Sequence, residues 1–135
     1  MAERERVVQG RLTNLQRLGP QGMALARAAA MLSPGAAPEL QEAVRENMSQ
    51  IDPAGYTQAV QMLGQANLLE DVKRLICAVA VASGEEDTVT APSSCDLVAQ
   101  TLALKRISLG AVGHACALEA VDAVNDLLGL PTLGI

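Results

Sequence analysis

Two side chains that could carry acid–base chemistry each follow a short apolar run of the sequence. Asp87 lies in segment 84–92, which reads GEEDTVTAP, and His114, the one histidine, lies in segment 110–119, which reads GAVGHACALE. An imidazole can take up and return a proton near neutral pH, and a neighbouring carboxylate can orient its ring. Asp87 and His114 are therefore the candidate catalytic residues, the acid and the base of a nucleophile–His–acid triad.

The segments around these residues predict a parallel strand unit. Apolar runs at 75–82 and 104–109 are expected to be strands, with a helix over 93–102 between them. Strands joined by such a crossover are parallel, and the loops that follow them meet at one edge of the sheet, where ligands bind. The sequence therefore predicts that Asp87 and His114 are neighbours.

The last helix is expected over 119–128 and ends at Gly129 and Pro131. Glu119 would favour its first turn through the helix dipole. Its apolar side chains are expected to face inward: Val121, Val124, Leu127 and Leu128.

The part of the chain before these strands is predicted to be helical. Gly19-Pro20 and Ser33-Pro34-Gly35 are expected breaks, and Asp52 is an expected N-cap. The expected helices are 3–18, 21–32, 38–49, one that opens at Pro53, and 68–75. The predicted fold class is α/β, with helices over 1–74 followed by a strand-helix-strand-helix segment with two parallel strands over 75–135.

The order strand, Gly-Glu-x-Asp-x-x-x-x-Pro, helix, strand, Gly-His, then Glu resembles the C-terminal part of α/β-hydrolases. The resemblance implies that Asp87 is the triad acid and His114 the triad base, and an acid before the histidine fits that superfamily. It also implies that 1–74 is a helical cap region and that 75–135 is the C-terminal βαβα segment of the fold.

The cap region has a narrower resemblance. Asp52-Pro53-Ala54-Gly55-Tyr56, followed by Ala66-Asn67-Leu68, is similar to the cap of 3-oxoadipate enol-lactonases and related meta-cleavage-product hydrolases. That family often has an acidic residue where Asn67 stands.

The sequence lacks the nucleophile that the resemblance calls for. A nucleophile elbow needs Gly-x-Ser-x-Gly, and neither Ser33, Ser83 nor Ser108 has glycines at both flanking positions. The resemblance therefore implies a partial hydrolase for ester, lactone or carbon–carbon bond hydrolysis, active only if a partner chain supplies the serine. The alternative is a catalytically inactive helical interaction or oligomerisation module derived from a truncated hydrolase.

Two strands leave an unpaired sheet edge, which needs a cover. The expected partner is a chain that carries the N-terminal half of a hydrolase, or else a second copy of this chain in a homo-oligomer. A complemented enzyme would take a small-molecule ester or lactone as its substrate.

Composition excludes several other classes. The chain has 135 residues, of which 50% are hydrophobic, and Tyr56 is its only aromatic residue, so one domain with a core of small side chains is expected. A net charge of −5 without a basic patch argues against nucleic acid, and no apolar run reaches the roughly 18 residues of a membrane span. The charged N-terminus lacks the apolar core of a signal peptide, so a cytoplasmic location is expected.

No metal and no cofactor are expected. The cysteines, Cys77, Cys95 and Cys116, are widely spaced and make neither a zinc pattern nor a disulfide framework. All of them are expected to be small buried residues.

Overall fold

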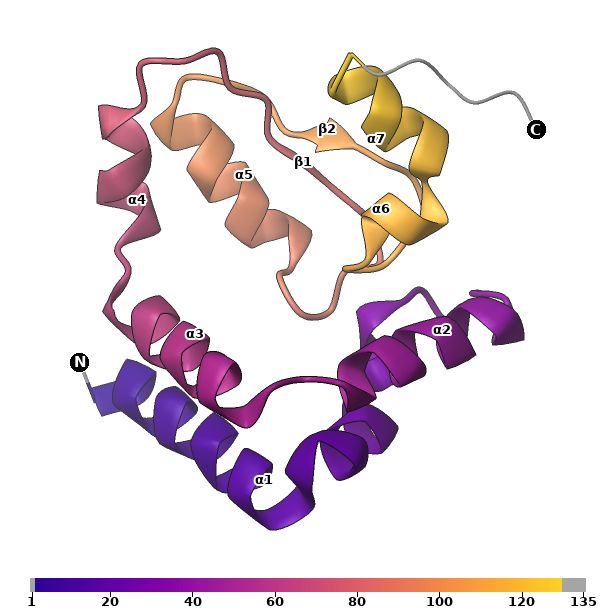
Figure 1. The fold of residues 1–135 in the computed structure, drawn as a ribbon. Helices are drawn as coiled ribbons and strands as arrows, with labels where there is room; N and C mark the ends of the chain where they lie inside the picture. The colour runs from indigo at the N-terminus through magenta and orange to yellow at the C-terminus, as the bar shows by residue number, and fades with distance from the viewer. Residues whose placement is uncertain (1, 130–135) are drawn as a thin grey trace.

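The computed structural model describes residues 2–129, which form a mostly helical chain with a small parallel sheet (Figure 1). The first part of the chain is helical, and the second wraps short helices around two strands. In order, the elements are α1 (Ala2–Arg27), η1 (Ala28–Met31), α2 (Pro38–Ser49), α3 (Pro53–Gln65), α4 (Leu68–Asp71), η2 (Val72–Arg74), β1 (Ala82–Ser83), α5 (Pro92–Thr101), β2 (Ile107–Ser108), α6 (Cys116–Glu119) and α7 (Val121–Leu127).

Helix α1 contains the break that the sequence predicts. Gly19 has φ +62 and ψ 177, which no helical residue adopts, and Pro20 follows it. The two arms of α1 therefore point in different directions (Figure 1), and α1 packs against both α2 and α3. The second arm ends in the 3₁₀ helix η1.

Helices α2 and α3 begin where the sequence places them. Each has a proline in its first turn, at Pro38 and Pro53. Asp52 caps α3, because its Oδ1 accepts a hydrogen bond from the Gly55 backbone N–H at 2.7 Å.

The strands are shorter than predicted. Of the expected run 75–82, only the last residue, Ala82, is in β1 (Ala82–Ser83), and the run 104–109 contributes Ile107–Ser108; the two strands pair in parallel with Ala82 opposite Ile107. Strand pairing extends only as far as two backbone segments lie side by side. In the described residues, β2 is the strand that pairs with β1. Segment 75–81 is consequently irregular.

The same segment corrects the expectation for Cys77. Its side chain is exposed rather than buried, and Ile76 beside it is 104% exposed. Cys95 and Cys116 are half-buried, and all three thiols are free.

The final helix is divided, which corrects the prediction of one helix over 119–128. Ala120 has φ −130 and ψ 52, so α6 ends at Glu119 and α7 starts at Val121. Glu119 thus closes a short helix instead of opening a long one. Most of the apolar side chains predicted to face inward are exposed, namely Val121, Leu127 and Leu128, whereas Val124 is partly buried.

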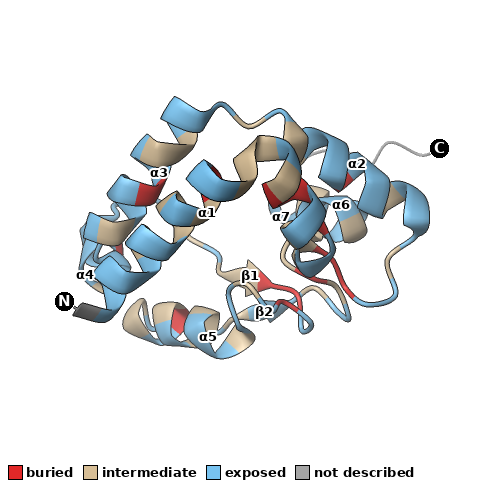
Figure 2. Cartoon of the chain, turned by 90° about the horizontal axis from the view of Figure 1, so that it is seen from below, coloured by how far each residue is buried: buried red, intermediate tan, exposed pale blue. Residues whose placement is uncertain are grey.

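Buried residues are few and are spread over several helices and loops rather than gathered in one large core. In Figure 2 they lie along the facing sides of α1 and α3, in α5, and in the loops that follow the strands. A cluster of Ala28, Leu32 and Val44 forms a core between η1 and α2, and Ala115 packs against it. The loop that carries His114 therefore rests on the helical part of the chain.

No helix in residues 2–129 has both the length and the hydropathy needed to cross a bilayer.

Candidate active site

The backbone that follows β1 is joined to the backbone that follows β2. Beyond the strands, the Glu85 N–H donates to the Gly110 carbonyl at 2.9 Å and the Glu86 N–H donates to the Val112 carbonyl at 3.1 Å. Gly84 makes the close approach possible, since a Cβ there would lie 2.0 Å from the Val112 carbonyl oxygen. The two loops thus leave the sheet side by side.

This arrangement brings Asp87 and His114 together, as expected from the sequence. His114 Nδ1 lies 2.9 Å from Asp87 Oδ2. The other oxygen of the carboxylate, Oδ1, accepts the backbone N–H groups of Val89 and Thr90, both at 2.8 Å. Both oxygens are engaged, so the loop fixes the direction in which Asp87 meets the imidazole.

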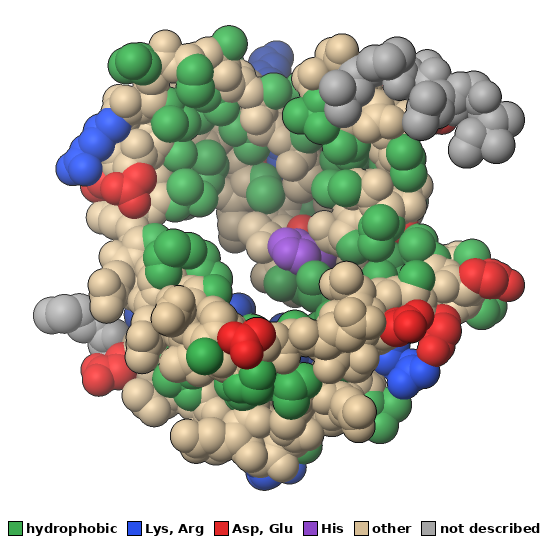
Figure 3. Space-filling model, viewed as in Figure 1, with side chains coloured by type: hydrophobic (Ala, Val, Ile, Leu, Met, Phe, Trp, Pro, Cys, Tyr) green, Lys and Arg blue, Asp and Glu red, His purple; other side chains and the backbone are tan. Residues whose placement is uncertain are grey.

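The contact decides which nitrogen of His114 is free. An ionised carboxylate can only accept a hydrogen bond, so Nδ1 of a neutral His114 carries the proton and donates a hydrogen bond to Asp87. Nε2 then holds the lone pair and can accept a proton from a third group. The imidazole lies on the wall of the hollow in the middle of the molecule (Figure 3), and its side chain is 34% exposed.

Asp87 is ionised in spite of its burial. The residue is 7% exposed. Burial opposes the charge, but hydrogen bonds from the Thr90 N–H, from His114 and from the Val89 N–H outweigh it and hold the pKa of Asp87 below its ordinary value. The acid of the pair therefore remains negatively charged at neutral pH.

The lowered pKa predicts how stability depends on pH. A carboxylate whose folded pKa lies below its unfolded value, about 3.9 for aspartate, stabilises the fold above that value. The stabilisation is lost as pH falls through the folded pKa. Urea denaturation between pH 7 and pH 3 should show this loss in the native chain.

The matched variant is Asp87→Asn, which keeps the shape but not the charge. It should be less stable at pH 7 by about 1–2 kcal/mol, and its stability should fall less steeply in acid. Asp122→Asn, at the exposed start of α7, makes the same change in net charge away from the site. Acid profiles of equal slope in the native chain and in Asp87→Asn would contradict the prediction.

The loop that carries His114 is held against the end of η1. The Ala115 N–H donates to the Met31 carbonyl at 2.7 Å, and a Cβ on Gly113 would lie 2.4 Å from the Leu32 carbonyl carbon. The carboxylate of Glu119 accepts the Gly113 N–H at 2.8 Å. The expected role of Glu119, favouring the first turn of a helix, is therefore replaced by a contact to the loop of the candidate base.

Arg106 is a site residue that the sequence pattern did not single out. Its side chain is 12% exposed, and its guanidinium contacts Glu85 at 3.1 Å and Asp96 at 3.0 Å. It also donates to the Ser83 carbonyl at 3.3 Å. Arg106 thus ties α5 to the strand that leads into the Asp87 loop. A charged residue inside a predicted strand was the available signal, because a charge that folding buries requires partners.

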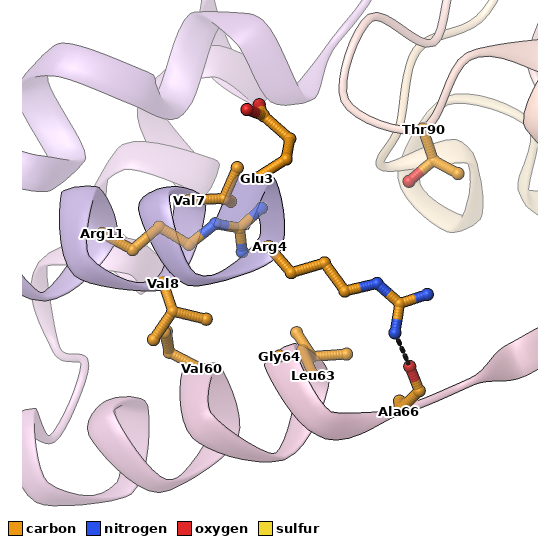
Figure 4. Close-up of a pocket in the computed structure, with 10 residues that line it drawn as sticks. All are labelled: Glu3, Arg4, Val7, Val8, Arg11, Val60, Leu63, Gly64, Ala66 and Thr90. Atoms are coloured by element: carbon orange, nitrogen blue, oxygen red, sulfur yellow. Dashed lines mark hydrogen bonds between the residues drawn. The ribbon is translucent and has the colours of Figure 1, made fainter. Parts of the chain in front are cut away.

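A cavity of about 420 Å³ opens between the start of α1, the end of α3 and the loop after Asp87 (Figure 4). Neither Asp87 nor His114 lines this cavity, but Thr90 does, and the Thr90 N–H is one of the donors to Asp87. The cavity therefore adjoins the acid loop. Apolar side chains line much of it, including Val7, Val8, Val60 and Leu63.

No cluster of three or more His, Cys, Asp or Glu side chains within the described range 2–129 is arranged to hold a metal ion. The chemistry that this arrangement offers is proton transfer at His114 Nε2, with Asp87 behind the ring.

Comparison with known proteins relates the fold to an esterase. A solved structure of a thermophilic esterase from Thermogutta terrifontis, with malate bound, matches this chain with a TM-score of 0.81 and 18% sequence identity. The match covers 96% of this chain and 49% of the esterase chain, so this chain spans about half the length of the esterase. No protein-family model and no curated protein sequence matches the chain.

Proposed function

We propose that this chain is the cap and C-terminal half of an α/β-hydrolase, and that Asp87 and His114 are the acid and base of a Ser-His-Asp triad. The observation that carries the proposal is the 2.9 Å contact between His114 Nδ1 and a buried Asp87, at the ends of two parallel strands. A fold shared with about half of an esterase supports it. The nucleophilic serine would lie outside residues 1–135.

The proposed reaction follows from the free nitrogen of His114. The serine hydroxyl attacks the carbonyl carbon of the substrate while His114 Nε2 takes its proton, and His114 then gives that proton to the leaving group. Water, deprotonated in turn by His114, releases the acyl group and restores the serine. Asp87 holds the ring and stabilises the imidazolium between these steps.

The proposed partner is a polypeptide that carries the remaining strands and the Gly-x-Ser-x-Gly elbow. The pairing of β1 with β2 leaves one side of β1 without a neighbouring strand in the described residues. Leu75 and Ile76, in the segment that leads into β1, are 49% and 104% exposed, and Ile107 on β2 is 40% exposed. A further strand beside β1 would pair with this open edge and extend the sheet.

The proposed substrates are small esters or lactones, or compounds cleaved at a carbon–carbon bond next to a carbonyl. The cap resemblance to enol-lactonases and meta-cleavage-product hydrolases supports this class. The cavity beside Thr90 supports it as well, because the apolar side chains of α1 and α3 that line it suit the carbon skeleton of such a substrate.

A second candidate is a non-catalytic module that assembles with itself through exposed apolar side chains. Leu25 on α1 is 76% exposed, and Met62 and Leu63 on α3 are 64% and 57% exposed. These exposed apolar side chains favour association. A non-catalytic module, however, gives the Asp87–His114 contact no role.

Complementation separates the two candidates. The purified chain should not hydrolyse p-nitrophenyl acetate alone, and should do so after mixing with a polypeptide encoded beside it that carries Gly-x-Ser-x-Gly. A stable homo-oligomer that stays inactive in every such mixture would support the non-catalytic module instead.

A further inference from the structure

A third carboxylate, outside the Asp87–His114 pair, joins the His114 loop to the helical part of the chain. Glu119 Oε2 accepts the Gly113 N–H at 2.8 Å. Both of its oxygens lie 3.1 Å from the Ser33 N–H, and the Ser33 hydroxyl donates to Oε1. Gly113 precedes the candidate base, and Ser33 lies just after η1, so one side chain connects the two segments.

The donors that meet Glu119 are buried. Ser33 is 8% exposed, and Gly113 is buried against the backbone of Leu32. A buried N–H without an acceptor costs about 1–3 kcal/mol, so these groups depend on the carboxylate.

His114 sits between two fixed points of the backbone. On one side Gly113 is bonded to Glu119, and on the other the Ala115 N–H is bonded to the Met31 carbonyl at 2.7 Å. With both neighbours held, the backbone of His114 has little freedom, which limits the directions in which its ring can point.

We infer that Glu119 is a positioning residue, which keeps the His114 ring in hydrogen-bonding contact with Asp87 by clamping Gly113 to Ser33. The inference rests on the proposed function for its catalytic meaning, but not for its geometry. Glu119 also couples Ser33, just after η1, to the candidate base. A shift of Ser33 would be transmitted to His114 through this one side chain.

The chain offers a direct readout, because His114 is its one histidine. Labelling with ¹⁵N-histidine gives ring signals from that residue alone, and their shifts at high pH report which nitrogen of the neutral ring carries the proton. The native chain should show the Nδ1–H form that Asp87 requires. Glu119→Gln should lose this single form and show a mixture of tautomers, with its far-UV circular dichroism unchanged.

Two further variants keep the test sharp. Asp122→Asn removes one negative charge from the exposed start of α7 and should leave the ring signals as in the native chain. Ser33→Ala removes only the hydroxyl donor and should shift the tautomer signals in the same direction as Glu119→Gln, by a smaller amount. If Glu119→Gln does not fold, Ser33→Ala decides the matter.

A folded Glu119→Gln chain that keeps the native Nδ1–H population would overturn the inference, as would an unchanged Ser33→Ala chain where Glu119→Gln is unfolded. A native chain with the neutral proton on Nε2 would overturn it as well. None of these measurements needs a nucleophilic serine or a substrate. The role of Glu119 can therefore fail while the proposed function stands, and the proposed function can fail while the role of Glu119 stands.

Discussion

Replacing His114 with alanine is expected to lower ester hydrolysis by the complemented enzyme by about 10⁴-fold or more. The free Nε2 of His114 is the group proposed to take the proton of the serine, and no second imidazole exists in the chain to replace it. A neutral serine is a weak nucleophile without an adjacent base. The measurement is the initial rate of p-nitrophenyl acetate hydrolysis by equimolar mixtures of the two polypeptides.

Two controls make this result specific. Asp122→Asn lies outside the site and should retain the native rate. His114→Ala must also still bind the nucleophile-bearing polypeptide, which gel filtration of the mixture measures. A complex of normal size that hydrolyses the ester at the native rate with alanine at position 114 would contradict the assignment of the base.

Replacing Gly84 with alanine is expected to destabilise the chain by about 3 kcal/mol. The added Cβ would lie 2.0 Å from the Val112 carbonyl oxygen and 2.8 Å from the Gly113 carbonyl oxygen. These atoms belong to the backbone beside His114, so they can yield only if the two loops separate. Urea denaturation should show a lower midpoint, or the loss of a cooperative transition.

Gly10→Ala is the matched control for the same chemical change. Gly10 is an exposed residue inside α1, and a Cβ there meets nothing within 4 Å. Alanine should raise the stability by up to about 1 kcal/mol, because glycine is a poor helix former. Equal midpoints for the two variants would show that the backbone at Gly84 does not lie against the Val112 carbonyl.

The sequence predicts best where local chemistry fixes the structure. Pro38 and Pro53 open α2 and α3, and Gly19-Pro20 breaks α1, because proline and glycine constrain the backbone whatever surrounds them. The neighbouring positions of Asp87 and His114 followed from the rule for parallel crossovers. These predictions needed no knowledge of distant contacts.

The predictions that were wrong depended on partners far away in the chain. Of the strand predicted over 75–82, only Ala82 is in β1 (Ala82–Ser83), because a strand needs a second segment of backbone alongside to pair with, and apolar composition alone does not provide one. The sequence spacing predicts that Glu119 stands at the start of a helix. Its bonds to Ser33, 86 positions away, were invisible to local spacing.

Arg106 illustrates the same limit for the site. Its guanidinium contacts Glu85, in the loop after β1, and Asp96, in α5. The charge inside an apolar run was a signal that partners exist, but their identity depends on how α5 crosses the sheet.

We propose that this chain supplies the base and that another polypeptide supplies the serine. The most direct test is the labelling of that serine by a fluorophosphonate probe. Such a probe reacts with a serine activated by a neighbouring base, and it requires no substrate specificity. The polypeptide that carries Gly-x-Ser-x-Gly should be labelled rapidly when this chain is added, and slowly when it is alone or mixed with His114→Ala. Labelling at the same rate in all three samples would contradict the claim that His114 serves a nucleophile located outside residues 1–135.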